Sequence, residues 1–157
     1  HREHMTVTLE ERHGTKLELV VLARRREPDA YARKLILKGG QPGRVVLLGI
    51  MKVAFRHAGE AVRARVLEER TPLGRILIEH DILRYIETFA YVRVRLNERL
   101  RALFGAPAGA TVTYGRVAGI VCPPSPPGPG PGRGGEQRSP DLEPAVELLE
   151  IVAPEDP

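Results

Sequence analysis

An arginine stands on the apolar side of a predicted strand, where its charge needs a partner. In the segment 30–38 (AYARKLILK), Arg33 has the same parity as three apolar residues, Tyr31, Leu35 and Leu37. Side chains two residues apart share one face of a strand. A guanidinium on such a face is costly to bury unless a negative group pairs with it. The partner is either an acid of the chain or a ligand carboxylate, which arginine can bind through two parallel hydrogen bonds.

Two glutamates on the last predicted strand, segment 144–152 (PAVELLEIV), point to opposite faces. Glu150 has the parity of Val146, Leu148 and Val152, and Glu147 that of the other apolar residues. At least one carboxylate therefore enters an apolar setting, unless the strand lies at an edge with its glutamates in water. A carboxylate in an apolar setting pairs with an arginine or carries a raised pKa.

The remaining candidate residues have plainer interpretations. Thr71-Pro72-Leu73-Gly74 is typical of a helix start, with Thr71 as the cap. The run Arg24–Arg26 is followed at once by acids and is interpreted as a solvated loop. Cys122 is the single cysteine, which excludes an internal disulfide and a cysteine-cluster metal site and fits a reducing cytoplasm. We expect no metal and no cofactor.

The elements that must position these residues form a strand-rich pattern with helices inserted between hairpins. Without regular βαβ alternation, the pattern predicts an α+β fold whose antiparallel sheet is covered by helices on one face and encloses a ligand pocket. We expect strands at 16–23, 30–38, 44–55, 82–95, 111–121 and 144–152, and helices at 59–69, 71–81 and 97–104.

Composition sets the domain organisation. The 157 residues suit one domain, from Met5 to Pro157, and His1–His4 resembles a cloning remnant. The segment 123–140 (PPSPPGPGPGRGGEQRSP) is too rich in proline and glycine to pack, so we interpret it as a flexible loop inserted between two strands.

Charge and hydropathy limit the partners. No stretch approaches the roughly 20 apolar residues of a membrane span, and no secretory signal is visible. The net charge is +4, but the arginines are scattered among acids, so we expect no nucleic-acid partner and no membrane partner. A small molecule is the expected partner, and the oligomeric state is not predicted.

Four segments resemble the chorismate lyase family in motif and order, and they look most like its divergent branch. They are Tyr31–Gly40 (YARKLILKGG) with Gln41-Pro42, Thr71–Ile78 (TPLGRILI), Leu148–Pro154 (LLEIVAP) and the opening Thr6–Val21. The resemblance covers nearly the whole chain from Met5, and it is the ordered set of motifs that carries it.

The resemblance implies a cofactor-independent lyase that cleaves chorismate to 4-hydroxybenzoate and pyruvate in an enclosed pocket. By its motifs, Arg33 binds a substrate carboxylate, Leu73 and Gly74 contact the substrate, and Glu150 lies at the reacting end. Arg33 and Glu150 are thus the expected catalytic residues, and Val45–Leu48 is expected to wall the pocket from water.

The chain departs from the family at Leu47, where the well-studied enzymes carry a second carboxylate-binding arginine. Leu47 is therefore expected to line the substrate site without anchoring a charge. Three functions follow: a lyase acting on chorismate or a related substrate; a repurposed biosynthetic enzyme, such as a cyclase of secondary metabolism, with a less charged substrate; and a non-catalytic ligand-binding domain. The same fold also serves as an effector-binding domain in bacterial regulators.

Overall fold

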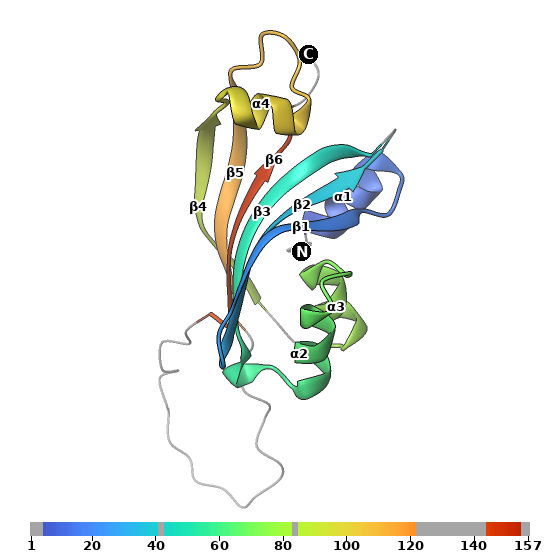
Figure 1. Cartoon of the computed structure of the whole chain (residues 1–157), viewed down its shortest axis with the longest axis vertical. Helices are drawn as coiled ribbons and strands as arrows, with labels where there is room; N and C mark the ends of the chain where they lie inside the picture. The colour runs from blue at the N-terminus through green and yellow to red at the C-terminus, as the bar shows by residue number, and fades with distance from the viewer. Residues whose placement is uncertain (1–4, 41–42, 83–84, 122–143, 155–157) are drawn as a thin grey trace, which may run out of the picture.

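The chain folds as an α+β structure around one antiparallel sheet, as the element pattern predicts (Figure 1). This computed structural model describes residues 5–40, 43–82, 85–121 and 144–154. The six described strands are β1 (Glu18–Arg26), β2 (Ala30–Gly39), β3 (Arg44–Ala54), β4 (Tyr85–Arg95), β5 (Val112–Val121) and β6 (Val146–Val152). Their order in the sheet is β1-β2-β3-β6-β5-β4, so that β1 and β4 form its two edges.

Five helical segments complete the described chain. They are α1 (Met5–His13), the 3-10 turn η1 (Phe55–His57), α2 (Glu60–Leu67), α3 (Leu73–Glu79) and α4 (Glu98–Phe104). Asn97 caps α4 by accepting a hydrogen bond of 2.9 Å from the Leu100 amide, and Gly105 ends it in the left-handed region at φ 57°. No described helix has the length and apolar character needed to cross a bilayer.

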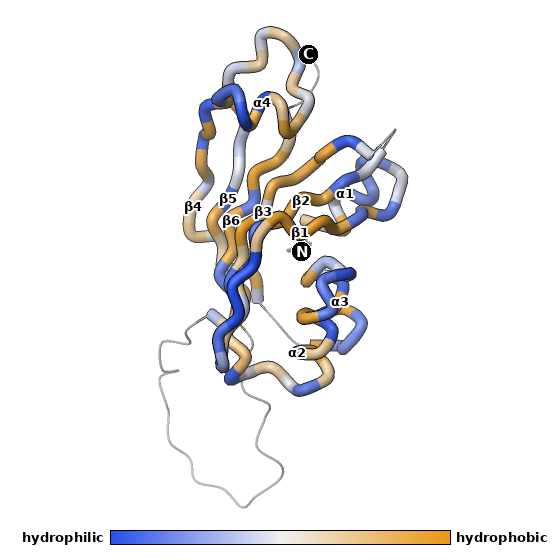
Figure 2. Tube along the Cα trace, viewed as in Figure 1, coloured by the Kyte–Doolittle hydropathy of each residue, from blue (hydrophilic) through white to orange (hydrophobic). Residues whose placement is uncertain are grey.

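The helices lie on both faces of the sheet rather than on one. The main core joins α1, α2 and α3 to strand residues of one parity, among them Tyr31, Leu37 and Val53; we call this side the inner face. A smaller core joins Phe104 of α4 to residues of the other parity, Ile36, Leu48 and Ile151, on the outer face. The expected single helical layer was thus wrong for α4. Figure 2 shows apolar residues following the middle strands, as two-sided packing requires.

Two further expectations are corrected. Arg24–Arg26 is the end of β1 and not a loop, because the strand continues past a bulge between Val21 and Ala23 to pair with β2. Helix α3 begins after Pro72, which occupies the cap position without a side-chain hydrogen bond, so Thr71 is not the cap. Cys122, the segment 123–140 and the first four residues lie outside the described residues.

Candidate functional site

An apolar cavity lies on the inner face between the sheet and the helices, and Arg33, Leu47, Leu73 and Glu150 are among its lining residues. Its volume is about 50 Å³, which is room for roughly three to five water molecules. Leucines of β1, β2, β3, β6 and α3 make up half of its lining residues. The polar side chains among its lining residues are Thr6 of α1, Arg33 of β2 and Glu150 of β6.

Strand register places Arg33 and Glu150 on the same face. Arg33 pairs with Met51 of β3, which pairs with Leu148 of β6, and Glu150 lies two residues beyond Leu148. From the usual strand spacing and rise, their Cα atoms are roughly 12 Å apart. Each therefore reaches the cavity from its own strand, with β3 between them.

The Arg33 guanidinium is buried with most of its hydrogen-bonding capacity unused. Arg33 is 2% exposed, and its Nη2 atom donates a long hydrogen bond of 3.4 Å to the carbonyl oxygen of Thr71. Within the described part of the chain, Nε and Nη1 have no hydrogen-bond partner. Burial lowers the pKa of Arg33 from its ordinary value, against the opposing effects of Tyr31 and Glu69. Unpaired buried donors cost about 1–3 kcal/mol each, so the site favours an incoming acceptor.

Glu150 is the more buried of the two glutamates, a choice that parity leaves open. Glu147 is exposed, whereas the Glu150 side chain is 17% exposed and forms a 2.6 Å ion pair with Nε of Arg116 on β5. Burial raises the pKa of Glu150, and the Arg116 charge only partly opposes this effect. Glu150 therefore holds a proton more readily than an ordinary glutamate.

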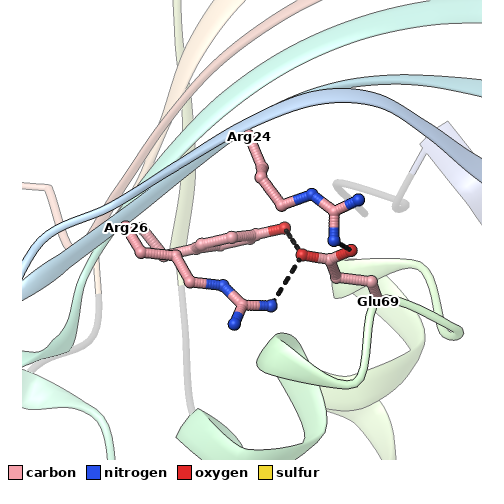
Figure 3. A network of polar contacts seen from close by, with 4 residues as sticks. Arg24, Arg26 and Glu69 are labelled. Carbon is pink, nitrogen blue, oxygen red and sulfur yellow. Dashed lines mark hydrogen bonds and ion pairs between the residues drawn. The ribbon is translucent and has the colours of Figure 1, made fainter.

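A second carboxylate fastens the segment that covers Arg33. Glu69 follows α2 in the left-handed backbone region, at φ 59°, which is costly for a non-glycine residue. Figure 3 shows Arg24 and Arg26 converging on its carboxylate, with ion pairs of 2.7 and 3.1 Å. The hydroxyl of the fully buried Tyr31 donates to Glu69 at 2.9 Å. We call these four residues the Glu69 latch.

The latch also shifts the protonation of its members. Burial, followed by the hydrogen bond to Glu69, raises the pKa of Tyr31. For Glu69, burial alone would raise the pKa, but the hydrogen bonds from Tyr31 and Arg26 and the charge of Arg24 outweigh it, and the pKa is lowered. Glu69 is thus ionised and clamped at neutral pH.

Helices α1 and α3 are tied together above the cavity. Arg75 of α3 forms an ion pair with Glu10 of α1, and Glu10 also accepts a 3.2 Å hydrogen bond from the Leu17 amide. These contacts place Thr6 of α1 and Leu73 of α3 on the cavity wall, where both are buried. The cover of the cavity is therefore held at two points, this ion pair and the Glu69 latch.

Only some of the other predicted contact residues line the cavity. Leu47 and Leu73 line the cavity, whereas Gly74 is buried within α3 and is not among the lining residues. The expectation that all of Val45–Leu48 walls the cavity was wrong, because Val45 and Leu48 pack in the core of the outer face. Alternation of side chains allows only part of that run to face inward.

Sequence reasoning missed Arg116, Glu69 and Thr6. Arg116 shares the parity of the buried Ala118 and Ile120, so the sequence pattern indicates that its side chain lies on the inner face. Its pairing with Glu150, however, depends on the register of β5 with β6. Glu69 and Thr6 reach the site from helical segments, whose docking the sequence pattern does not specify.

A larger hollow of about 320 Å³ lies beneath α1 and shares no lining residue with the first. Arg12, His13 and Arg44 line it, and Arg44 already donates to the carbonyl oxygen of Pro154 at 3.4 Å. Unlike Arg33, these groups lie outside the apolar core. No cluster of His, Cys, Asp or Glu in the described ranges has the arrangement of a metal site.

Comparison with known proteins supports the fold. No family model matches the chain, and no curated protein matches it. Among solved structures, the chain is similar to PhnF from Mycobacterium smegmatis, with a TM-score of 0.55 and 12% sequence identity. The match covers 98% of this chain and 64% of that chain, so this chain spans somewhat less than two thirds of the PhnF chain's length. At this identity the similarity concerns architecture alone: the chain has a chorismate lyase-like α+β fold.

Proposed function

We propose that the protein binds a small, largely apolar organic carboxylate in the inner-face cavity, with Arg33 as the anchor. The observation that carries this proposal is the buried Arg33 guanidinium, whose Nε and Nη1 atoms lack partners in the described part of the chain. A carboxylate can accept two parallel hydrogen bonds from such a guanidinium. The bound anion would thereby satisfy donors that are costly to leave unpaired in the free protein.

The cavity wall sets the rest of the ligand's chemistry. Leu35, Leu37, Leu47 and Leu148 offer apolar contacts, and Leu47 provides no second charge for another carboxylate. The proposed ligand therefore carries one carboxylate and an apolar body. A cavity of about 50 Å³ is too small for a ring, since a benzene-sized guest needs about 150 Å³. Binding would require the cover formed by α3 and the preceding turn to move outward.

The direct test is calorimetry with a panel of aromatic monocarboxylates, such as benzoate and 4-hydroxybenzoate, and of matched dicarboxylates. We expect saturable binding of monocarboxylates, weaker binding of dicarboxylates and none of the corresponding amides. Arg33→Met should abolish binding. Arg25→Met is the matched control, because Arg25 lies on an exposed part of β1 in an ion pair with Glu27. Equal binding of acids and amides would contradict the proposal.

A second candidate function is a lyase of the chorismate type, favoured by the position of Glu150. An elimination that releases pyruvate breaks a carbon–oxygen bond and transfers a proton, and a carboxyl group with a raised pKa suits proton transfer near neutral pH. Glu150 lines the same cavity as Arg33 and carries such a pKa. Arg33 would hold the substrate carboxylate while Glu150 moves the proton.

Incubation with chorismate at high enzyme concentration, with pyruvate and 4-hydroxybenzoate measured by chromatography, tests the lyase. Turnover that disappears in Glu150→Gln would support it. Absence of turnover would eliminate chorismate lyase activity while leaving the carboxylate site to the calorimetric test. A repurposed enzyme for a less charged substrate remains compatible with the apolar wall at Leu47 in that outcome.

A further inference from the structure

The edge strand β4 presents aromatic side chains to solvent. Among the described residues, seven large hydrophobic side chains are exposed, and Tyr85, Phe89 and Tyr91 of β4 and Tyr114 of β5 are four of them. Tyr91 is the most exposed, at 83%. By register, Tyr91 and Tyr114 share one face beside the regular part of β4, whereas Tyr85 lies on the opposite face beyond the bulge; exposed tyrosine and phenylalanine side chains are enriched in protein interfaces.

Among the described residues, no strand lies beyond the outer side of β4. In the described sheet β4 pairs with β5 alone, and it forms one of the two edges in Figure 1. The strand is 11 residues long, and an edge of this length offers a row of backbone donors and acceptors. A bulge between Thr88 and Ala90 interrupts the first half, which leaves 90–95 as the regular part.

We propose that β4 pairs with β4 of a second copy of this chain, in antiparallel register, with the two-fold axis at Val92. The segment 90–94 has the sequence AYVRV. In this register it lies opposite the same segment of the second copy, which runs in the reverse direction. Tyr91 then lies opposite Arg93 of the partner subunit, and Arg93 lies opposite the partner subunit's Tyr91. Val92 meets its own copy, and Ala90 meets the partner's Val94. Every opposing pair is apolar or cation–aromatic, and both kinds stabilise strand pairing.

Neighbouring registers are less favourable. An axis at Arg93 sets two arginines directly opposite each other, and like charges in that position are destabilising. An axis at Tyr91 brings the bulge against the partner's Arg93, where regular pairing ends. At the other edge, β1 carries Arg24–Arg26 in succession, which opposes self-pairing there. An isologous interface requires a patch that is complementary to itself, and 90–94 meets this requirement.

The proposed β4 interface lies outside the ligand cavity but adjoins its wall. Tyr91 pairs across the strands with Arg116, which holds Glu150 in the cavity wall. Docking of a second copy on β4 would reduce the access of water to the row that contains this ion pair.

Cysteine cross-linking tests the register. In a Cys122→Ser background, Val92→Cys should form an interchain disulfide under mild oxidation. Residues opposite each other lie about 4.5–5.5 Å apart in Cα positions, within the range that a disulfide spans. Val94→Cys is the matched control, since in this register the two copies of residue 94 are displaced by roughly 13 Å. Efficient cross-linking at 94 and not at 92 would overturn the register.

A reciprocal exchange tests the pairing without a cross-link. Sedimentation should show a dimer of the full chain, and Tyr91→Arg should weaken it about tenfold or more, because two arginine pairs replace two cation–aromatic pairs. The double variant Tyr91→Arg/Arg93→Tyr restores opposite partners and should restore the dimer. Circular dichroism confirms folding of each variant. A monomeric parent chain, or a double variant no better than the single one, would refute the proposal.

Discussion

Arg33 and Glu150 face one cavity from strands β2 and β6, and they do not form an ion pair with each other. Glu150 is paired with Arg116 at 2.6 Å, whereas two nitrogen atoms of Arg33 lack a partner in the described part of the chain. The charge of Glu150 is thus balanced by Arg116, which does not line the cavity, whereas the Arg33 guanidinium is left to bind a ligand. This asymmetry leads to predictions that separate stability from function.

Arg33→Met should stabilise the ligand-free protein while abolishing carboxylate binding. Replacement of a buried, poorly satisfied charge by an apolar side chain of similar length is expected to raise the free energy of unfolding by about 1–3 kcal/mol. Loss of the anchor should weaken binding by roughly 2–5 kcal/mol. Denaturant unfolding and calorimetry measure the two effects. Arg33→Lys should recover binding only in part, because an ammonium lacks the planar fork; a destabilised Arg33→Met would show that Arg33 supports the fold.

Glu150→Gln should impair proton transfer in the cavity and leave Arg116 without its ionic partner. If the lyase proposal holds, turnover should fall by about 10²–10⁴-fold, while the protein stays folded at the temperature of the assay. Glu147→Gln is the control on the same strand, and its exposed side chain predicts no effect. Loss of activity in Glu147→Gln with none in Glu150→Gln would contradict the assigned roles.

Glu69→Gln should loosen the cover of the cavity. The amide keeps the side-chain shape but removes the charge that holds Arg24 and Arg26, so we expect faster ligand association and a lower melting temperature. The adjacent Glu68→Gln is the control, because Glu68 pairs with Arg65 at the exposed surface. Stopped-flow binding measures the rate, and unchanged association in Glu69→Gln would show that the latch does not limit entry.

The same two glutamates predict opposite dependences of stability on pH. The pKa of Glu69 is lowered on folding, so its contribution is complete above the ordinary glutamate value, about 4.3, and is lost as the pH falls through the folded value. The pKa of Glu150 is raised, so the folded state holds its proton more tightly and this contribution grows as the pH falls towards the ordinary value. Denaturant unfolding from about pH 3 to pH 7 should therefore show two changes. The fall in the free energy of unfolding with rising pH, above about pH 4.3, should disappear in Glu150→Gln, and the fall with decreasing pH, below about pH 4.3, should diminish in Glu69→Gln.

Gly115→Ala should destabilise the site through the backbone. A Cβ atom at Gly115 would overlap the carbonyl oxygen of Glu150 and approach Ile151 on β6. Backbone atoms cannot turn aside as a side chain can, so β5 and β6 would have to separate. We expect a loss of about 1–3 kcal/mol in the free energy of unfolding, together with weaker ligand binding. Wild-type stability would show that the two strands adapt at this point.

Alternation of apolar residues predicts much of this molecule. The hairpin of β2 and β3, the burial of Arg33 and the opposite directions of Glu147 and Glu150 all follow from a period of two. The expectations that Thr71 caps α3 and that Arg24–Arg26 form a loop were wrong, because strand pairing and helix docking override local preferences. The Arg116–Glu150 pair depends on register between segments distant in sequence, which a periodic pattern does not encode.

Apart from α1, the cover of the cavity is one uninterrupted stretch of chain. Helices α2 and α3 both lie between β3 and β4, whereas Arg33 and Glu150 belong to the sheet. Recombination or engineering could therefore replace residues 55–82 as a unit. Such a replacement would alter the shape of the ligand that fits the cavity, while the anchor Arg33 on the sheet stays unchanged. Diversification of ligand preference in this architecture could then proceed by substitution of one module, with little penalty to the framework beneath.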